Sequence, residues 1–221
     1  MRRSAWLLLS VFFLPAVAHS QDVASLCRSF AHPELSVGRW ASYATTRRGR
    51  SDSVRIAIIG SERDHDTTFY WFEFSSHERN GDAVVFQILM PAAYDVGHAR
   101  AAVMKSGTEQ AIKIPMQMFR MTAGRTFKDP REDFVHRCAR AHLVGWESVT
   151  VPAGTFRAAH LLVTDSLDHG HKGDVWATPD VGIGLVKMVE DDGTTMILTG
   201  RGTGAKSGIT EQPREMGFPS H

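Results

Sequence analysis

The stretch that decides the fold is VTVPAGTFRAAHLLVTD, residues 149–165, in which two runs of β-forming residues meet at a turn. Pro152 suits the second position of a β-turn because its ring fixes φ, and Gly154 suits the fourth position. Ala153 lies between them and favours a type I turn, since a type II turn requires a positive φ at that position. The stretch therefore predicts a β-hairpin inside a larger antiparallel sheet.

Alternation along the second run of this hairpin separates its two faces. The more apolar set is predicted to face the core, and it comprises Phe156, Ala158, His160, Leu162 and Thr164. The opposite face is also partly apolar, through Leu161 and Val163. His160 has two interpretations, a polar group inside a cavity or a histidine with satisfied hydrogen bonds in the core or at its rim, and the second is favoured.

The chain has 221 residues, of which 43% are hydrophobic, and a formal net charge of +1. This length and apolar content predict a single β-rich domain, which we place at residues 21–200. Short β-forming runs alternate with turn signals and give on the order of ten strands, the pattern of a barrel, half-barrel or sandwich. The near-neutral charge gives no excess of basic residues of the kind that binds nucleic acid.

The N-terminus has the organisation of a secretory signal peptide. Two arginines precede an apolar run at residues 6–14, which is too short to span a bilayer. Small residues follow and offer cleavage before His19 or before Gln21. We predict a cleaved signal peptide at residues 1–20 and a periplasmic or secreted mature protein, with an uncleaved anchor as the alternative.

Cys27 and Cys138 are the two cysteines of the chain. An even number of cysteines in an exported protein predicts a disulfide bond. The bond would close a loop of more than a hundred residues, for which the chain-entropy model gives about 4–5 kcal/mol of stabilisation. The alternative is a pair of buried free thiols.

Several other segments have a predicted conformation. Residues 22–31 are predicted to form a short helix, and residues 100–114 a hairpin in preference to a helical turn. The methionine-rich run after Pro115 has two interpretations, a helix that covers the core or an adaptable lip of a binding site. Residues 201–221 are rich in Gly, Ser, Pro and charge, and they predict a disordered tail.

Eleven histidines raise the possibility of a metal site. His169 and His171 are the best placed pair, because side chains at i and i+2 of a strand lie on one face about 7 Å apart. A zinc site usually needs three or four ligands, however, and this pair falls in a predicted Gly-containing turn, so no metal site is predicted. Neither a Gly-x-Ser-x-Gly nor a Cys-x-x-Cys motif occurs, and we predict no catalytic residue and no cofactor.

Three segments together carry a family resemblance: GRWASY at 38–43, VTVPAGTF at 149–156 and DVWATPDVGIGLVK at 174–187. In this order they resemble exported bacterial proteins of unknown function that are distantly similar to the lipoprotein-carrier (LolA/LolB-like) superfamily. The resemblance implies a mainly β fold, with a curved antiparallel sheet or unclosed β-barrel and one to three short helices over its concave face. Members of that superfamily bind acyl chains or other hydrophobic ligands there.

These observations predict a non-enzymatic binding protein for a hydrophobic ligand, a lipid or an acyl chain. The residues expected to line its cavity are large and apolar: Trp40, Phe69, Trp71, Phe86, Met116, Phe119, Trp146 and Trp176. One alternative is an accessory or structural subunit that binds an envelope protein and has no ligand cavity. The other is a metal-dependent enzyme that uses His169 and His171.

Overall fold

The structure is a computed structural model, and the residues it describes are 35–77, 81–91, 96–126, 141–164, 172–181 and 184–216. Several predicted features lie outside these ranges and stay predictions. They are the signal peptide, the helix at residues 22–31, the bond between Cys27 and Cys138, and the metal pair His169 and His171.

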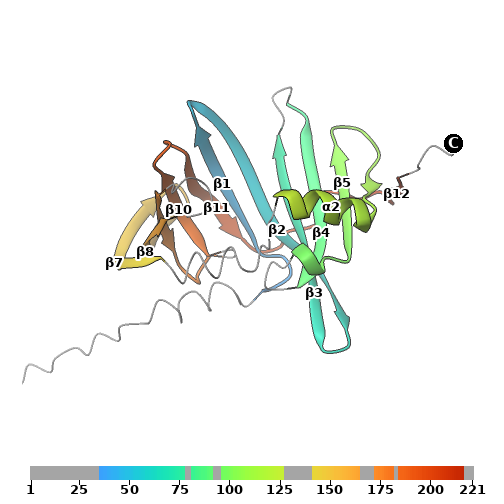
Figure 1. Cartoon of the computed structure of the whole chain (residues 1–221), viewed down its shortest axis with the longest axis horizontal. Coiled ribbons are helices and arrows are strands. Elements are labelled where there is room, and N and C mark those ends of the chain that lie inside the picture. Colours follow the sequence, from blue (N-terminus) through green and yellow to red (C-terminus); the bar gives the residue numbers. More distant parts are fainter. Residues whose placement is uncertain are drawn as a thin grey trace, which may run out of the picture.

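One twelve-stranded sheet dominates the described chain, in the order β12-β6-β5-β4-β3-β2-β1-β11-β10-β9-β8-β7 (Figure 1). Neighbouring strands are antiparallel except β12 and β6, which run parallel. The predicted mainly β fold with one large, unclosed and curved sheet is confirmed. The bounds are β1 Trp40–Arg47, β2 Arg50–Asp64, β3 Thr67–His77, β4 Ala83–Pro91, β5 Ala101–Ser106, β6 Ile112–Lys113, β7 His142–Val151, β8 Gly154–Thr164, β9 Lys172–Ala177, β10 Leu185–Glu190, β11 Thr195–Gly202 and β12 Arg214–Glu215.

Two helical segments accompany the sheet in the described ranges, η1 (Val96–His98) and α2 (Met116–Thr126). The helix α2 begins directly after Pro115, and β5 pairs with β6 as the predicted hairpin requires. Figure 1 shows α2 in front of β4 and β5, on the face of the sheet that we call the inner face.

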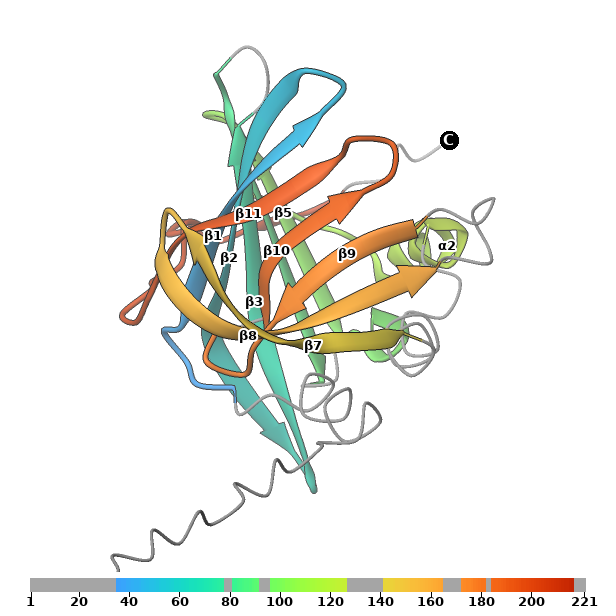
Figure 2. The ribbon, with the colours of Figure 1, turned by 90° about the vertical axis from the view of Figure 1, so that its left-hand side faces the viewer.

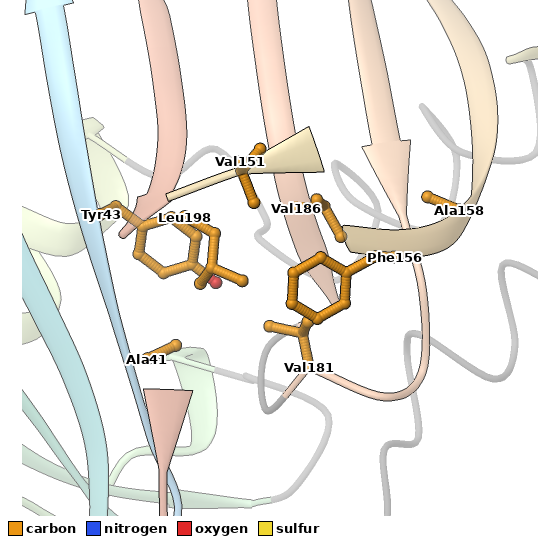
Figure 3. Packing of buried hydrophobic residues seen from close by; sticks show 8 residues of the cluster. All are labelled: Ala41, Tyr43, Val151, Phe156, Ala158, Val181, Val186 and Leu198. Atoms are coloured by element: carbon orange, nitrogen blue, oxygen red, sulfur yellow. The ribbon is translucent and has the colours of Figure 1, made fainter. Parts of the chain in front are cut away.

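The inner face carries one apolar layer that runs across most of the sheet. Beneath α2 and η1 it is formed by a cluster of Ile58, Phe72, Ile88, Met90 and Ala99. A second cluster continues it beyond β1 and comprises Ala41, Tyr43, Val151, Phe156, Ala158, Val181, Val186 and Leu198, whose side chains converge in Figure 3. We call this second group the Tyr43 cluster.

The predicted hairpin is present as β7 and β8, with Val151 paired to Gly154 across Pro152 and Ala153. Ala153 is not among the described residues with positive φ, which excludes a type II turn. The backbone N–H of Ala153 donates a hydrogen bond to the carbonyl of Leu198 at 3.3 Å. The tip of the hairpin is thereby bound to β11, a strand that is not its sheet neighbour, and Figure 2 shows the bend this requires in β7 and β8.

The predicted core face of β8 is correct for only half of the strand. Phe156 and Ala158 are buried in the Tyr43 cluster, but Leu162 is 38% exposed. At that end the opposite face is buried instead, through Ala159 and Leu161. The alternation itself is regular, so the change comes from the bend, which brings the near half of β8 over β11 and moves the far half away from it.

Residues 201–216, predicted as part of a disordered tail, are instead held against the sheet. Residues 201 and 202 complete β11, and Ile209 is buried with Val85 and Val103 of the outer face. The sequence pattern misses this segment because its attachment is largely polar. Few apolar residues are needed when buried hydrogen-bonding groups hold the backbone in place.

The main polar anchor of this segment is Glu73, which is 2% exposed. Its carboxylate accepts hydrogen bonds from Gln87 Nε2 at 2.8 Å and from the backbone N–H of Gly208 at 2.7 Å. Gln87 also donates to Ser207 Oγ at 2.8 Å, and Arg55 Nη1 lies 3.7 Å from the carboxylate. A buried charge with this set of partners is stable, whereas the same charge without them is costly.

Glu211 is expected to make the attachment of this segment depend on pH. Hydrogen bonds from the Lys105 ammonium (2.6 Å) and from backbone N–H groups lower the pKa of its carboxyl group from 4.5 to about 2. A carboxyl group with a lowered folded-state pKa stabilises the fold above pH 4.5 and loses this effect as pH falls through about 2. Glu211→Gln should therefore melt below wild type at neutral pH, and the difference should shrink between pH 4.5 and 2.

Thermal unfolding followed by circular dichroism over this pH range measures the effect. Glu215→Gln is the matched control, because Glu215 lies in the same segment and pairs with Lys113 at 2.7 Å but is 78% exposed. Exposed pairs contribute little, so this variant should melt close to wild type. A difference for Glu211→Gln that is the same at every pH would contradict the assignment.

Candidate functional site

A polar cluster outside the core lies on β8, β9 and β10. His160, Trp176 and Lys187 are paired directly across these three strands. The imidazole stacks on the indole with ring centroids 4.5 Å apart, and Lys187 Nζ lies 4.7 Å from the indole centroid. Trp176 is therefore flanked by an aromatic ring from one neighbouring strand and by a cation from the other.

A second row of side chains lies beside the first on the same strands. It consists of Leu162, Asp174 and Val189, again paired directly from strand to strand. Directly paired residues have their Cβ atoms about 4.5–5.5 Å apart, so the carboxylate of Asp174 stands between two aliphatic side chains. Its exposure of 40% leaves part of the carboxylate open to solvent.

Two carboxylates engage the two ring nitrogens of His160. Nε2 lies 2.6 Å from Asp174 Oδ1, and Nδ1 lies 3.4 Å from Glu147 Oε1. Trp176 Nε1 donates a hydrogen bond to the same oxygen of Glu147. A neutral imidazole has one donor and one acceptor nitrogen, so it donates to one of the two carboxylates at a time.

The pairing of β7 with β8 places Glu147 diagonally from His160. Gly145 is paired with His160, while Glu147 is paired with Ala158 two positions along. A Cβ added to Gly145 would meet no atom within 4 Å, so the space beside the imidazole is open. The Glu147 side chain can therefore reach His160 diagonally across the strand pair. The register of β7 and β8 shifts between Leu143 and Gly145.

A pocket of about 360 Å³ adjoins the cluster. Asp174 belongs to both the cluster and the pocket, and Leu162 and Val189 form apolar parts of the pocket wall. The lining residues come from β8, β9, β10 and the turn after β10: Leu162, Lys172, Gly173, Asp174, Val189, Glu190 and Asp191. The site thus combines an aliphatic surface with a rim of charge.

The eight residues predicted to line a cavity are divided between the two faces of the sheet. Phe86, Met116 and Phe119 meet beneath α2, where the rings of Phe86 and Phe119 stack with centroids 6.1 Å apart. Trp176 is not part of this group and stacks on His160 instead.

Three of the other residues lie on the outer face. Phe69 and Trp71 alternate with the inner-face residues of β3, and Trp40 alternates with those of β1. Trp146 packs against the cluster of Ala159 and Leu161, on the side of β7 and β8 that faces away from His160. The eight residues therefore do not line one common cavity, and ligand contact by any of them stays a prediction.

The methionine-rich helix covers part of the core, and its role as the lip of a binding site stays a prediction. Met116 and Phe119 pack on the core, which is the covering role. Met118 and Met121 are 40% and 61% exposed, so an apolar strip of α2 faces solvent. None of the helices in the described part of the chain has the length and apolar character of a membrane span.

Sequence reasoning identified Trp176 and His160 but missed Glu147, Asp174 and Lys187 as their partners. The available signal was the spacing of Asp174 and Trp176, which places both on one face of β9. Their contacts depend on the pairing of strands that are distant in sequence. Across the described ranges, no group of three or more histidine, cysteine or acidic side chains is arranged to hold a metal ion.

No protein-family model and no curated protein matches the chain. Solved structures with a similar fold include a candidate exported protein with a YmcC-like fold from Bacteroides fragilis, with 11% identity over 76% of this chain and 97% of that chain and a TM-score of 0.41. A candidate lipoprotein from Parabacteroides distasonis has 12% identity over 78% and 98% of the two chains and a TM-score of 0.40.

A chain of the Pseudomonas aeruginosa MucA/MucB complex is also similar, with 14% identity over 84% of this chain and 58% of that chain and a TM-score of 0.40. These likenesses are weak and concern the overall fold. No ligand, partner or site residue is carried from these structures to this chain.

The contact between Trp176 and Glu147 is expected to couple the two residues energetically. In a double-mutant cycle of Trp176→Phe and Glu147→Ala, the coupling free energy of unfolding should be about 0.5–1.5 kcal/mol, since Phe keeps the stacked ring but loses the indole N–H. Trp146→Phe with Glu147→Ala is the matched control, because Trp146 lies on the opposite face. Urea unfolding gives both values, and equal coupling in the two cycles would contradict the contact.

Proposed function

We propose that the chain is an exported, non-enzymatic binding protein for a hydrophobic ligand, and that the ligand binds at the pocket formed by β8, β9 and β10. The observation that carries the proposal is the pocket of about 360 Å³ beside His160 and Trp176. Its volume falls in the range of about 300–1,000 Å³ that is usual for small-molecule sites.

The wall of this pocket supports an apolar ligand. Leu162 is a large hydrophobic residue that remains 38% exposed, and Val189 lies across Asp174 from it. Covering such a surface with apolar ligand atoms contributes about 25 cal/mol for each Å² removed from water. The region beneath α2 is a weaker candidate, because Phe86, Met116 and Phe119 already pack there against the core.

The geometry of His160 supports binding in preference to catalysis. A general base needs a ring nitrogen that is available to take a proton from a nucleophile or substrate. Both nitrogens of His160 face carboxylates, and its side chain is only 17% exposed. The cluster therefore has the character of a fixed wall of a binding site.

The proposal is tested by titrating the protein with N-phenyl-1-naphthylamine, an uncharged probe whose fluorescence rises in apolar surroundings. Wild type should bind it, and Leu162→Gln should bind about three- to tenfold more weakly, because part of the apolar wall is replaced by an amide. Val37→Gln is the control, since Val37 is 52% exposed and does not line the pocket. Absence of probe binding by wild type, or equal loss in both variants, would overturn the proposal.

A second candidate function is the binding of an envelope protein along β7. This strand of ten residues ends the strand order, so within the described residues nothing pairs with its outer edge. Exposed strand edges can pair with an extended segment of another chain. The register shift beside Val144, which is 55% exposed, interrupts this edge and would limit the pairing to the part after it.

Site-specific photocrosslinking in the native envelope tests this second candidate. A photoreactive residue in place of Ser148, which is exposed on β7 after the shift, should crosslink a specific partner, and the same residue in place of Val37 should not. Crosslinks from both positions, or from neither, would count against a partner at β7.

A further inference from the structure

We infer that the C-terminal segment is exchangeable, so that the surface it occupies in its own chain also accepts the same segment of a second copy of this protein. We call residues 203–216 the strap, and the part of the outer face that binds them the strap site. The inference goes beyond the proposed function, because the strap site lies on β3 to β6, which are separated in the sheet order from the strands of the pocket.

The first half of the strap is bound by a buried carboxylate and an apolar contact. The backbone N–H of Gly208 donates to Glu73 at 2.7 Å. A Cβ at Gly208 would lie 3.4 Å from both carboxylate oxygens of Glu73, so the strap backbone rests directly on this group. The next residue, Ile209, is 8% exposed and packs with Val85 and Val103. The site thus engages one backbone N–H and one aliphatic side chain.

The second half of the strap is bound by charge and by strand pairing. Glu211 accepts hydrogen bonds from the Lys105 ammonium at 2.6 Å and from the backbone N–H of Ala111 at 3.3 Å. The two residues of β12 then pair in parallel with β6. Addition of an extended segment to a sheet edge is a common way of binding a peptide from another chain. The strap is therefore attached to its site in the manner of a peptide ligand.

The link between the strap and β11 is short and contains glycine. Gly204 has a φ of +78°, and a Cβ there would meet no atom within 4 Å. One backbone hydrogen bond, from Ala205 to the carbonyl of Gly38 at 2.8 Å, also holds this link. Ile209 is the one buried residue of the strap, all of which the structure describes. Few apolar contacts therefore have to break when the strap leaves its site, and glycine lets the link change direction at little cost.

A second copy is the partner that fits this site, because it carries the identical strap. Exchange replaces each contact of the strap with its site by the same contact between two chains. The cost is the loss of the tether, which holds the strap at a high effective concentration near its own site. The link of four residues, 203–206, reaches at most about 14 Å, so an exchanged pair has its two outer faces together.

A fluorescent peptide of residues 203–216 tests whether the site accepts the segment from outside. In the full chain, Ile209→Asp places a charge at the apolar contact and should free the site. This variant should bind the peptide at least about tenfold more tightly than wild type, because its own strap no longer competes. Fluorescence anisotropy measures both affinities.

A change in the peptide locates the binding at the strap site. A peptide that carries Glu211→Gln should bind the Ile209→Asp protein about three- to tenfold more weakly than the unchanged peptide, since it loses the charged contact with Lys105. This difference should disappear when Lys105→Met is added to the protein. A difference that persists would place the peptide elsewhere and overturn the inference.

A second strap variant covers the case in which Ile209→Asp does not fold, which circular dichroism detects. Glu211→Gln in the full chain should also bind the peptide more tightly than wild type, by about threefold, because it weakens the strap and leaves the site intact. Glu215→Gln is the control, since Glu215 is 78% exposed, and it should behave as wild type. If the folded strap variants bind the peptide no more tightly than wild type, the inference is overturned.

Mixing two full-length variants tests whether a second copy supplies the strap. Ile209→Asp has an intact site, whereas Lys105→Glu has an intact strap and places a like charge opposite Glu211. By sedimentation equilibrium, the equimolar mixture should form a dimer at a concentration at which each variant alone is a monomer. Wild type should need a higher concentration than the mixture, because its own straps compete. A mixture that stays monomeric would overturn the inference even if the peptide binds.

Discussion

The pairing of β1 with β11 is the contact on which the rest of the structure depends. Strands β1 to β6 and strands β7 to β11 each follow one another in space, and β1 and β11 join the two series. Tyr43 secures this junction. It is fully buried, it is paired with Leu198, and its hydroxyl donates a hydrogen bond to the carbonyl of Leu185 at 3.0 Å. One residue thus supplies both the apolar contact and the satisfied polar group that the junction needs.

The bend of the sheet around this junction is what exposes the candidate site. When the tip of the β7–β8 hairpin binds β11 through Ala153, Phe156 enters the core and Leu162 is carried away from it. A flat sheet would give β8 one buried face along its full length. The curved sheet changes the buried face midway, and the surface that is left uncovered holds His160 and Asp174. The bend that curves the sheet is therefore also what exposes the candidate binding surface.

Local signals in the sequence predicted the features that depend on neighbouring residues alone. Pro152 and Gly154 predicted the turn of the β7–β8 hairpin, and Pro115 predicted the helix α2 that begins at the next residue. The candidate site could not be predicted in this way, because Asp174 meets Leu162 and Val189 only through pairings between three strands. The position of the C-terminal segment was not predicted, because alternation and hydropathy give no sign that a segment is attached through a buried carboxylate such as that of Glu73.

The partners of Glu73 also constrain when the sheet can form. Glu73 lies in β3, but one of its hydrogen-bond donors is the backbone of Gly208, which is synthesised far later. The same delay applies to β1, whose partner β11 ends at Gly202. A growing chain therefore has no means of completing its central strand pairs or of satisfying its buried carboxylate until nearly the whole sequence has been made. Long-range pairing of this kind slows folding. For a chain with a predicted signal peptide, this delay would leave these contacts unmade until nearly the whole chain has crossed the membrane.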